Sequence, residues 1–467
     1  MPKRILLYIL CIALCAGAIS ACSAKETAPQ TPSLQPDAPV DTAPVEPVVL
    51  PDADKILSDA FATEETPLGE LLYTEIEGGV CITGYTGQGT QVRIPATASG
   101  LPVVAIGDGA FADNETLTSL VLPDTLQSIG SGILSGCTAL KALRTPLLGA
   151  DASKDQYLGY LFGSARFEDN PRDVPASLAV LEIGGAWETL PAYALYDCND
   201  LTVISLPSTL RTVEKYAMSR CSSLLLVNGI SSVEKFGEHA LSYCESLETL
   251  SFGASVTEIG FAALEGCHKL RTLTVPFVGG SLTQNTYLGY IFGAAYPDFA
   301  MGYYSAALSR VEVLGGTELC ENAFFECATL KEVVLPASLK TVGTRAFYGC
   351  RALWSVTLPD AVTTVRESAF AGCDSLLSID LGASLSSLGI NAFMNCDSLE
   401  SIVLPATLNA LPASAFYGCS SLSQVDLGGV ESVGAQAFRG CTALTAVVMH
   451  ASVSFGEGNE NASKLVS

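Results

Sequence analysis

Apolar residues recur along most of the chain with a period of about 23 residues. Within one period a short alternation of apolar and polar residues, such as Leu399, Ile402 and Leu404, runs into Pro405. Such alternation predicts a short β-strand, and the proline ends the strand because it has no amide hydrogen to donate. A second apolar set follows and closes on an aromatic residue, here Phe416. We therefore expect each period to form one coil of a solenoid.

Cysteines mark the same phase of successive periods. Consecutive members are 23 residues apart, except for two gaps near 60 and a final gap of 22. Asn114 occupies this phase one step before the first cysteine. A fixed period of this size is the signature of repeats that bury their apolar faces only against their neighbours. The cysteines are Cys137, Cys198, Cys221, Cys244, Cys267, Cys327, Cys350, Cys373, Cys396, Cys419 and Cys441.

These cysteines are expected to form a structural ladder of buried thiols. Residues of equal phase stack about 5 Å apart, and parallel side-chain vectors do not give the dihedral angle of a disulfide. A free thiol is a small apolar filler with a weak donor, and Asn114 in the same phase indicates a role in satisfying loop backbone groups. No metal site is expected, because the chain has no Cys-x-x-Cys pair and its three histidines are isolated.

The two long gaps each contain a stretched unit, near residues 137–175 and 267–305. Residues 157–163 read Tyr-Leu-Gly-Tyr-Leu-Phe-Gly, and residues 287–293 read Tyr-Leu-Gly-Tyr-Ile-Phe-Gly. The copies lie 130 residues apart, which indicates that a block of five units was duplicated. Counting the stretched units predicts 14 coils. Phenylalanines in the phase of Phe416 are expected to stack inside these coils: Phe111, Phe324, Phe347, Phe370, Phe393 and Phe438.

The complete pattern resembles a known family. Leu-x-x-Ile-x-Leu-Pro followed by Leu-x-x-Ile-Gly-x-x-Ala-Phe-x-Gly-Cys is similar to the BspA-type leucine-rich repeat of bacterial surface proteins, with good instances at 330–350 and 376–396. The resemblance covers roughly residues 68–450. It implies a β-rich leucine-rich-repeat solenoid, with one short strand plus a second short strand or helical turn per coil. It also implies adhesion to host proteins or to other cells.

The start of the chain predicts export. Lys3 and Arg4 precede an apolar run over residues 5–18, which is too short for an ordinary spanning helix. The run ends in Ile-Ser-Ala-Cys at 19–22, which resembles the lipobox of bacterial lipoproteins and implies lipidation of Cys22. The alternative is an ordinary signal peptide with Cys22 incidental. With the lipid as the only membrane contact, we expect a surface-exposed protein anchored to the bacterial cell envelope.

The remaining boundaries follow from composition and period. Residues 1–21 form the signal peptide, and residues 22–54, rich in Pro, Ala and Thr, form the lipidated cysteine and an extended tether. Residues 55–105 are assigned to an N-terminal cap and first repeat, residues 106–450 to the solenoid, and residues 451–467 to a C-terminal tail.

Charge and the absence of catalytic motifs narrow the function. The chain has 48 acidic and 24 basic residues, a net charge of −24, and such a surface repels nucleic acid and anionic membranes. Gly-x-Ser-x-Gly, His-Glu-x-x-His and the Walker phosphate loop are absent. We therefore expect no enzyme, no cofactor and no nucleic-acid partner. An extended acidic face would bind extracellular or cell-surface proteins, or glycans; the alternative is a structural or assembly scaffold of the envelope.

Candidate binding residues come from two sets. One is the outward position of successive strands, which is either a set of residues that tolerate the pleat or a partner-binding face. This stripe comprises Val121, Arg144, Ser205, Asn228, Ser251, Thr274, Val334, Thr357, Asp380, Val403, Asp426 and Val448. The other set is the aromatic residues outside the core phase, which either supply binding energy or fix the stretched units onto the solenoid. These are Trp187, Trp354, Tyr157, Tyr160, Tyr287, Tyr290, Tyr296, Tyr303 and Tyr304.

Overall fold

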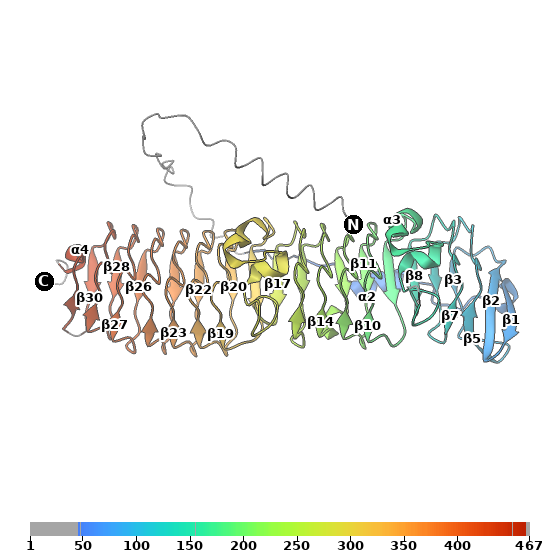
Figure 1. Ribbon diagram of the computed structural model, residues 1–467, viewed down its shortest axis with the longest axis horizontal. Helices are drawn as coiled ribbons and strands as arrows, with labels where there is room; N and C mark the ends of the chain where they lie inside the picture. Colours follow the sequence, from blue (N-terminus) through green and yellow to red (C-terminus); the bar gives the residue numbers. More distant parts are fainter. Residues whose placement is uncertain (1–44, 47, 155, 451, 464–467) are drawn as a thin grey trace, which may run out of the picture. The chain divides into compact units, whose positions relative to one another are not determined.

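The computed structural model describes residues 45–463 apart from 47, 155 and 451, so the signal-peptide, lipidation and most of the tether predictions lie outside the described residues. The described chain winds about 16 turns of a β-solenoid with a spacing of about 23 residues. Its strands follow one another in chain order along one axis (Figure 1). The predicted fold class is confirmed, with about two more turns than the sequence indicated.

The first described elements close one end of the array. Helix α2 (Ala53–Ala60) begins just before the predicted end of the tether, and Asp52 caps it by accepting a hydrogen bond from the Lys55 amide at 3.1 Å. A short 3-10 helix η1 (Leu68–Glu70) leads into the antiparallel hairpin of β1 (Leu71–Ile76) and β2 (Gly79–Tyr85). Strand β2 then pairs in parallel with β5 (Leu101–Ile106), which also pairs with β4 (Thr97–Ala98). The hairpin thus gives way to parallel coils.

Each regular coil contributes one strand of three or four residues to the first face of the solenoid. These strands are parallel and in register, as in the pairing of β11 with β13 through Ile204 and Val227. The strands are β3 (Gln91–Arg93), β6 (Ser119–Val121), β8 (Ala142–Thr145), β9 (Val180–Ile183), β11 (Val203–Ser205), β13 (Leu226–Asn228), β15 (Thr249–Ser251), β17 (Thr272–Val275), β18 (Arg310–Val313), β20 (Glu332–Val334), β22 (Ser355–Thr357), β24 (Ser378–Asp380), β26 (Ser401–Val403), β28 (Gln424–Asp426) and β30 (Ala446–Val448).

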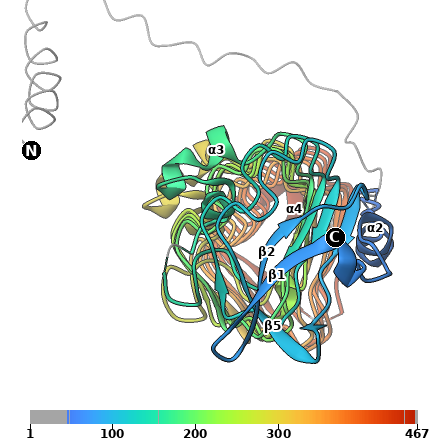
Figure 2. The ribbon, with the colours of Figure 1, turned by 90° about the vertical axis from the view of Figure 1, so that its right-hand side faces the viewer.

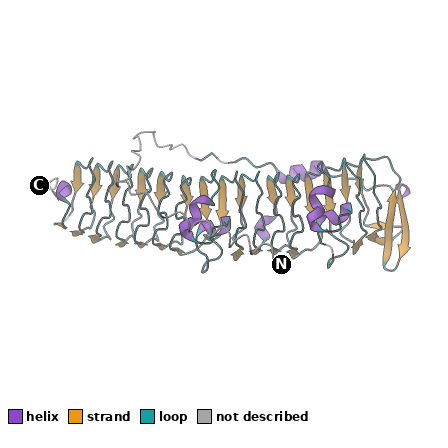
Figure 3. Cartoon of the chain, turned by 45° about the horizontal axis from the view of Figure 1, so that its top comes forward, coloured by secondary structure: helices purple, strands orange, loops and turns teal. Residues whose placement is uncertain are grey.

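A second face is built from strands of two residues, which also pair in parallel from coil to coil. Figure 3 shows both rows of strands along the array. The predicted alternative for this half of the coil was a strand or a helical turn, and in these coils it is a strand. The strands are β7 (Ser128–Ile129), β10 (Thr189–Leu190), β12 (Thr212–Val213), β14 (Lys235–Phe236), β16 (Glu258–Ile259), β19 (Glu318–Leu319), β21 (Thr341–Val342), β23 (Thr364–Val365), β25 (Ser387–Leu388), β27 (Ala410–Leu411), β29 (Ser432–Val433) and β31 (Ser454–Phe455).

The stretched units carry most of the helical turns. The first contains η2 (Leu158–Phe162), η3 (Phe167–Asp169) and α3 (Asn170–Asp173), and the second contains η5 (Leu288–Phe292) and η6 (Pro297–Gly302). A further turn, η4 (Ile230–Ser232), lies between them in sequence. Viewed along the array, α3 and the second stretched unit lie on one side and α2 on the other (Figure 2). Residues assigned to a C-terminal tail form β31 and the short helix α4 (Glu460–Ser463).

A column of phenylalanines fills the core of the C-terminal coils. Neighbouring rings stack at centroid distances of 5.0 to 5.7 Å with planes within 8°. Phe111 lies outside this stack, because the coils that follow it carry leucine or methionine in the same phase, and it contacts Tyr85 instead. The stacked residues are Phe324, Phe347, Phe370, Phe393, Phe416 and Phe438.

The periodic cysteines extend through more of the array than this column, and they are buried and free of disulfides. Most thiols donate to a carbonyl oxygen of the preceding coil, as Cys350 does to Phe324 and Cys373 to Phe347, both at 3.2 Å. Cys198 follows a stretched unit and donates to Tyr196 of its own coil instead, at 3.9 Å. The residue before each cysteine has a positive φ, for example 73° at Gly266, which explains the recurring Gly-Cys pair. Burial raises the pKa of the Cys221 and Cys267 thiols to about 12.

Candidate functional site

The outward stripe on the first face is only partly open to solvent. Thr357, Asp380 and Val403 are exposed, but Val121 and Ser205 are buried, so the expectation of a solvent-facing stripe is wrong for these two. The strands that pair with those of Val121 and Ser205 contact the chain's own N-terminal segment. Helix α2 contacts β9, and beside β3 the Arg93 guanidinium donates to the Ala62 carbonyl at 2.9 Å. The exposed members of the stripe therefore begin at Ser251 and lie mostly in the C-terminal coils.

The acidic members of the stripe bind their own turns. Asp380 accepts the amide of Gly382 at 3.0 Å, and Asp426 accepts the amide of Gly428 at 2.9 Å. Asp426 is also 2.9 Å from His450 Nε2. Asp380 lines a shallow hollow of about 530 Å³ together with Val403, while Thr357 stands exposed on its strand. These carboxylates stabilise turns, and what they leave on the surface is a shallow, weakly polar depression.

The two tryptophans are half-buried and lie apart. Trp354 follows the core residue Leu353, and its indole Nε1 is shielded from solvent without a hydrogen-bond partner. Trp187 donates from Nε1 to the Pro146 carbonyl at 2.6 Å and forms one wall of a cleft of about 590 Å³. Asp124 and Glu214 also line this cleft, but both carboxylates accept backbone amide hydrogens there. Neither indole stands free on the surface as an anchor.

The repeated motif of the stretched units packs onto the solenoid. The Tyr157 hydroxyl donates to the Ser164 carbonyl and that of Tyr287 to the Ala294 carbonyl, both at 3.0 Å. Tyr160 and Tyr290 meet these rings edge to face, at 6.4 and 6.2 Å. In the first copy the Leu158 amide donates to a carbonyl of the next coil at 2.8 Å. Of the two interpretations, this geometry favours packing over binding for Tyr157, Tyr160 and Tyr287, whereas Tyr290 also contacts Phe261 of the neighbouring coil at 5.4 Å.

Each stretched unit also satisfies the same carbonyl of the following coil, two residues before its cysteine. In a regular coil this oxygen accepts a backbone amide hydrogen; for example, the Tyr348 carbonyl accepts the Glu326 amide at 2.7 Å. The first stretched unit uses the buried Asn170 side chain, which donates to the Tyr196 carbonyl at 2.8 Å. The second uses the Tyr304 hydroxyl, which donates to the Phe325 carbonyl at 3.0 Å. Different side chains therefore replace one missing backbone donor.

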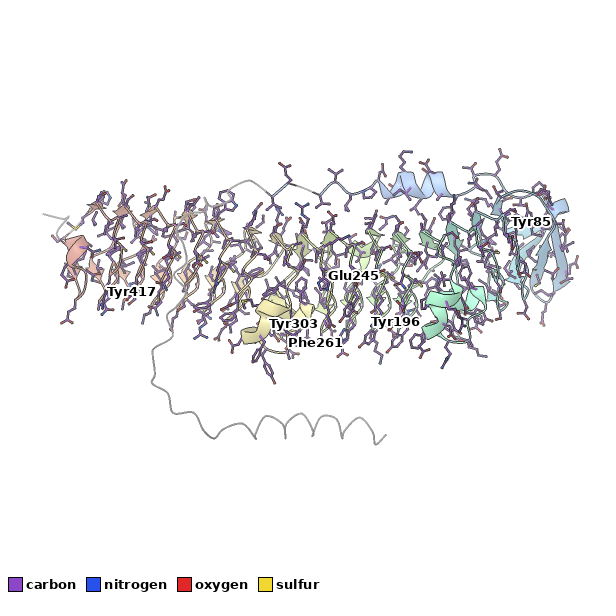
Figure 4. All side chains as sticks on the ribbon, turned by 90° about the horizontal axis from the view of Figure 1, so that it is seen from above. Tyr85, Tyr196, Glu245, Phe261, Tyr303 and Tyr417 are labelled. Atoms are coloured by element: carbon purple, nitrogen blue, oxygen red, sulfur yellow. The ribbon has the colours of Figure 1, made fainter. Side chains whose placement is uncertain are left out.

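Beyond this shared packing the two copies diverge. In the first, Arg166, Asp169 and Arg172 form ion pairs beside α3. In the second, η6 and its flanks expose large apolar side chains, which we call the η6 cluster: Tyr296 is 65% exposed, Phe299 67%, Met301 59% and Tyr303 46%. The Tyr296 and Phe299 rings contact each other edge to face at 6.5 Å. Tyr303 lies on the same side of the array as Phe261 and Tyr196 (Figure 4).

Tyr296 and Tyr303 were predicted from the sequence as candidate binding residues, whereas Phe299 and Met301 were not. These two residues fall in no repeating phase, so the coil pattern gave them no weight. Alignment of the two copies at their offset of 130 residues is the signal that would have found them. Arg166 and Asp169 in the first copy correspond to Tyr296 and Phe299 in the second. Replacement of charged by exposed aromatic residues points to a contact surface, because such residues commonly supply binding energy.

Other kinds of site leave no sign in the described ranges. Within residues 45–463, gaps aside, no group of three or more His, Cys, Asp or Glu side chains is placed to hold a metal ion. Among the helices in that part of the chain, none is both long and apolar enough to cross a membrane.

Comparisons with known proteins found one matching family and several similar solved structures. No curated protein matches. A crystal structure of a leucine-rich repeat protein from Bacteroides ovatus is 19% identical, with a TM-score of 0.32 over 83% of this chain and 98% of that one. A leucine rich cell surface protein from Faecalibacterium prausnitzii is 23% identical, with a TM-score of 0.31 over 84% of this chain and 96% of that one.

The BspA type leucine rich repeat region matches in 6 copies, over residues 91–149, 176–289 and 317–454. The two intervals between these ranges, 150–175 and 290–316, fall mainly on the stretched units. Since the matched ranges cover more than half of the chain, this protein belongs to the BspA-type leucine-rich repeat family, whose members are typically bacterial surface proteins.

Proposed function

We propose that this protein is a non-catalytic adhesion module, anchored to the bacterial envelope through a lipid on Cys22, that binds proteins of host or neighbouring cells. Leucine-rich repeat proteins generally bind other proteins, and an array of coils offers a long surface for this. The net charge of −24 favours partners with basic surfaces.

The observation that carries the proposal is the η6 cluster. The surface of a soluble protein rarely exposes several large apolar side chains side by side unless they contact a partner. Phe299 and Met301 lie two residues apart in the short helix η6, and each is more than half exposed. Aromatic residues and methionine are also the side chains that are enriched at protein interfaces. The cluster therefore has both the exposure and the composition of a contact centre.

The test measures saturable binding of the exported chain to immobilised extracellular-matrix and cell-surface proteins, with glycan arrays alongside. The Phe299→Ser, Met301→Ser double variant should weaken binding about tenfold or more, because a few central residues carry most of an interface's energy. Val403→Ser is the matched control, since Val403 is 68% exposed and apolar but lies on the first face. Absence of saturable binding, or equal losses in both variants, would contradict the proposal.

The anchor is tested separately. Mass spectrometry of the mature amino terminus should find a lipid-modified Cys22, and Cys22→Ser should release the protein from cells. An unmodified amino terminus at another residue would favour the ordinary signal peptide.

A further inference from the structure

A continuous row of aromatic rings joins the two stretched units. Phe167 of η3 stacks on Tyr193 at 4.2 Å, Tyr193 on Tyr216 at 5.2 Å, and Tyr216 on His239 at 4.7 Å. The row continues edge to face from His239 to Phe261 at 6.1 Å and on to Tyr290 of η5 at 5.4 Å. We call Phe167, Tyr193, Tyr216, His239, Phe261 and Tyr290 the ring row. All six side chains are half-buried, so part of each ring faces solvent.

Three members of the ring row occupy an unfavourable backbone conformation. Tyr193, Tyr216 and His239 have φ values of 63°, 56° and 55°, in the left-handed region that is uncommon for residues other than glycine and least favourable here for the two tyrosines. Most other coils place a glycine or a polar residue at this position. The glycine and polar residues at this position are Gly109, Gly132, Asn322, Arg345, Ser368, Asn391, Ser414 and Gln436, and one further coil has Ala262 there. Stacking of the rings offsets part of the strain.

Strain of this kind is a guide to function when the core does not require the residue. The coils with Gly109 or Ser368 fold without an aromatic residue at this position, so stacking is not needed to build a coil. At this turn position of the described coils, aromatic rings occur only in three consecutive coils, those of Tyr193, Tyr216 and His239. This restriction to neighbouring coils indicates that the rings form a ligand-binding surface.

The surroundings of the ring row are acidic. Glu265 accepts the Tyr243 hydroxyl at 2.9 Å and lies 3.1 Å from Nδ1 of His239, and Glu238 is exposed beside that histidine. Burial raises the pKa of the Tyr216 phenol, and the nearby Tyr193 and these two glutamates raise it further. Basic side chains are also present, since the Arg220 guanidinium lies 5.5 Å from the centre of the Tyr243 ring. Carboxylates beside partly apolar rings favour a ligand that is apolar along its centre and basic at its flanks.

The spacing of the rings selects the shape of that ligand. Successive centroids are 4.2 to 6.1 Å apart along the array. An α-helix lying along the row advances about 5.4 Å per turn, so one apolar residue per turn would meet one ring. An extended strand repeats its side chains on one face roughly every 6.6 Å and would drift out of step within a few coils.

We propose that the ring row docks an amphipathic α-helix of a partner protein, with its apolar stripe on the rings and lysine or arginine residues toward Glu238 and Glu265. This inference rests on the proposed function and names the kind of partner that the same side of the array receives. Contacts between η5 and η6 link the end of the row at Tyr290 to the η6 cluster. A helix in the row and a second contact at the cluster would form one continuous interface.

The experiment uses the full exported chain and two labelled peptides of about 18 residues, long enough for about five helical turns. Both contain leucine and lysine in the same proportions; one has leucine at helical spacing, and the other alternates leucine and lysine. Fluorescence anisotropy in about 0.15 M salt, where long-range charge effects are screened, gives the dissociation constants. A chitin oligosaccharide is the third probe. The helical peptide should bind about tenfold tighter than the alternating one.

The Tyr193→Ser, Tyr216→Ser double variant should weaken binding of the helical peptide about tenfold or more. Tyr348→Ser is the matched control, because Tyr348 also stacks on a ring, Phe325 at 5.2 Å, but outside the row. Equal binding of both peptides, preference for the oligosaccharide, or equal effects of the two variants would overturn the inference. Matrix-protein binding that depends on Phe299 while neither peptide binds would overturn this inference alone and leave the proposed function standing.

Discussion

The side-chain amide of Asn461 donates to the carbonyl oxygen of Phe438 at 2.9 Å. One coil earlier the equivalent oxygen, that of Phe416, accepts the thiol of Cys441 at 3.1 Å. The asparagine side chain thus makes the hydrogen bond that a cysteine thiol makes in the regular coils. Asn459 completes the substitution, because its Oδ1 accepts the Phe438 amide at 2.9 Å where a backbone carbonyl would otherwise stand. Residues 459–461 therefore close the open end of the array.

Removal of this closure should loosen the end of the array. Asn459→Ala leaves the buried Phe438 amide without a partner, which costs about 1–3 kcal/mol. Since coils contact only their neighbours, the loss should stay near the terminus. Hydrogen exchange measured by mass spectrometry should rise over residues 432–455 and not over residues 119–145. The exposed Glu457→Ala is the control, and uniform exchange changes along the whole array would contradict the prediction.

The second stretched unit allows a matched test of a single hydroxyl. Tyr304→Phe removes the donor to the Phe325 carbonyl and keeps the ring, so it should lower the free energy of unfolding by about 1–3 kcal/mol. Tyr303→Phe removes an exposed hydroxyl from the adjacent residue and should change stability by less than about 0.5 kcal/mol. Urea denaturation followed by circular dichroism compares the two variants. Equal stabilities would mean that the hydrogen bond carries no net energy.

The buried thiols predict a loss of stability at high pH. Burial raises the pKa of Cys221, Cys267 and Cys327 to about 12 from an ordinary 9.0. Above pH 9 the unfolded chain releases these protons and the folded chain keeps them, so the folded state binds more protons. The stabilisation is complete below pH 9 and is lost as the pH rises toward 12. Each such thiol contributes a slope of up to about 1.4 kcal/mol per pH unit.

Unfolding free energies between about pH 8 and pH 11 measure this slope. Because tyrosine and lysine also titrate there, the informative comparison is with Cys267→Ser, which removes one titrating thiol. The variant should show a shallower decline than the unchanged chain. An identical slope would indicate that the thiol is not protected by burial.

The same burial predicts chemical inertness at neutral pH. The thiolate is the reactive form of cysteine, and neither solvent access nor a lowered pKa is present along the ladder. Iodoacetamide should therefore leave Cys350 and Cys373 unmodified in the folded protein and label them in urea. Peptide mass spectrometry reads each position separately, with the half-exposed Cys320 as an internal comparison. Rapid labelling of Cys373 in the folded state would be incompatible with a stacked column.

The period made the coils predictable because every coil meets the same neighbours. Leu399 and Cys396 recur since one packing solution is repeated, and the family resemblance agreed with it. The contact of the N-terminal segment with β9 and Arg93 could not be predicted in this way, because α2 is a non-repeating segment and none of its residues is fully buried. The ring row has a periodic signal in Tyr193, Tyr216 and His239, but these residues lie at a turn position, whereas the predicted binding stripe was built from strand positions. Phe299 and Met301 have no such periodic signal.

The stretched units leave the sheet register unchanged. Leu143 pairs with Leu181 across the first unit, and Leu273 pairs with Val311 across the second, although both pairs lie 38 residues apart in the chain. A loop can therefore lengthen, shorten or change its side chains without any adjustment of the scaffold beneath it. Whole blocks of coils can likewise be copied, since every new junction reproduces a packing that already exists. In this architecture the loop side chains that contact partners can change while the packing between coils, and with it the stability, stays the same.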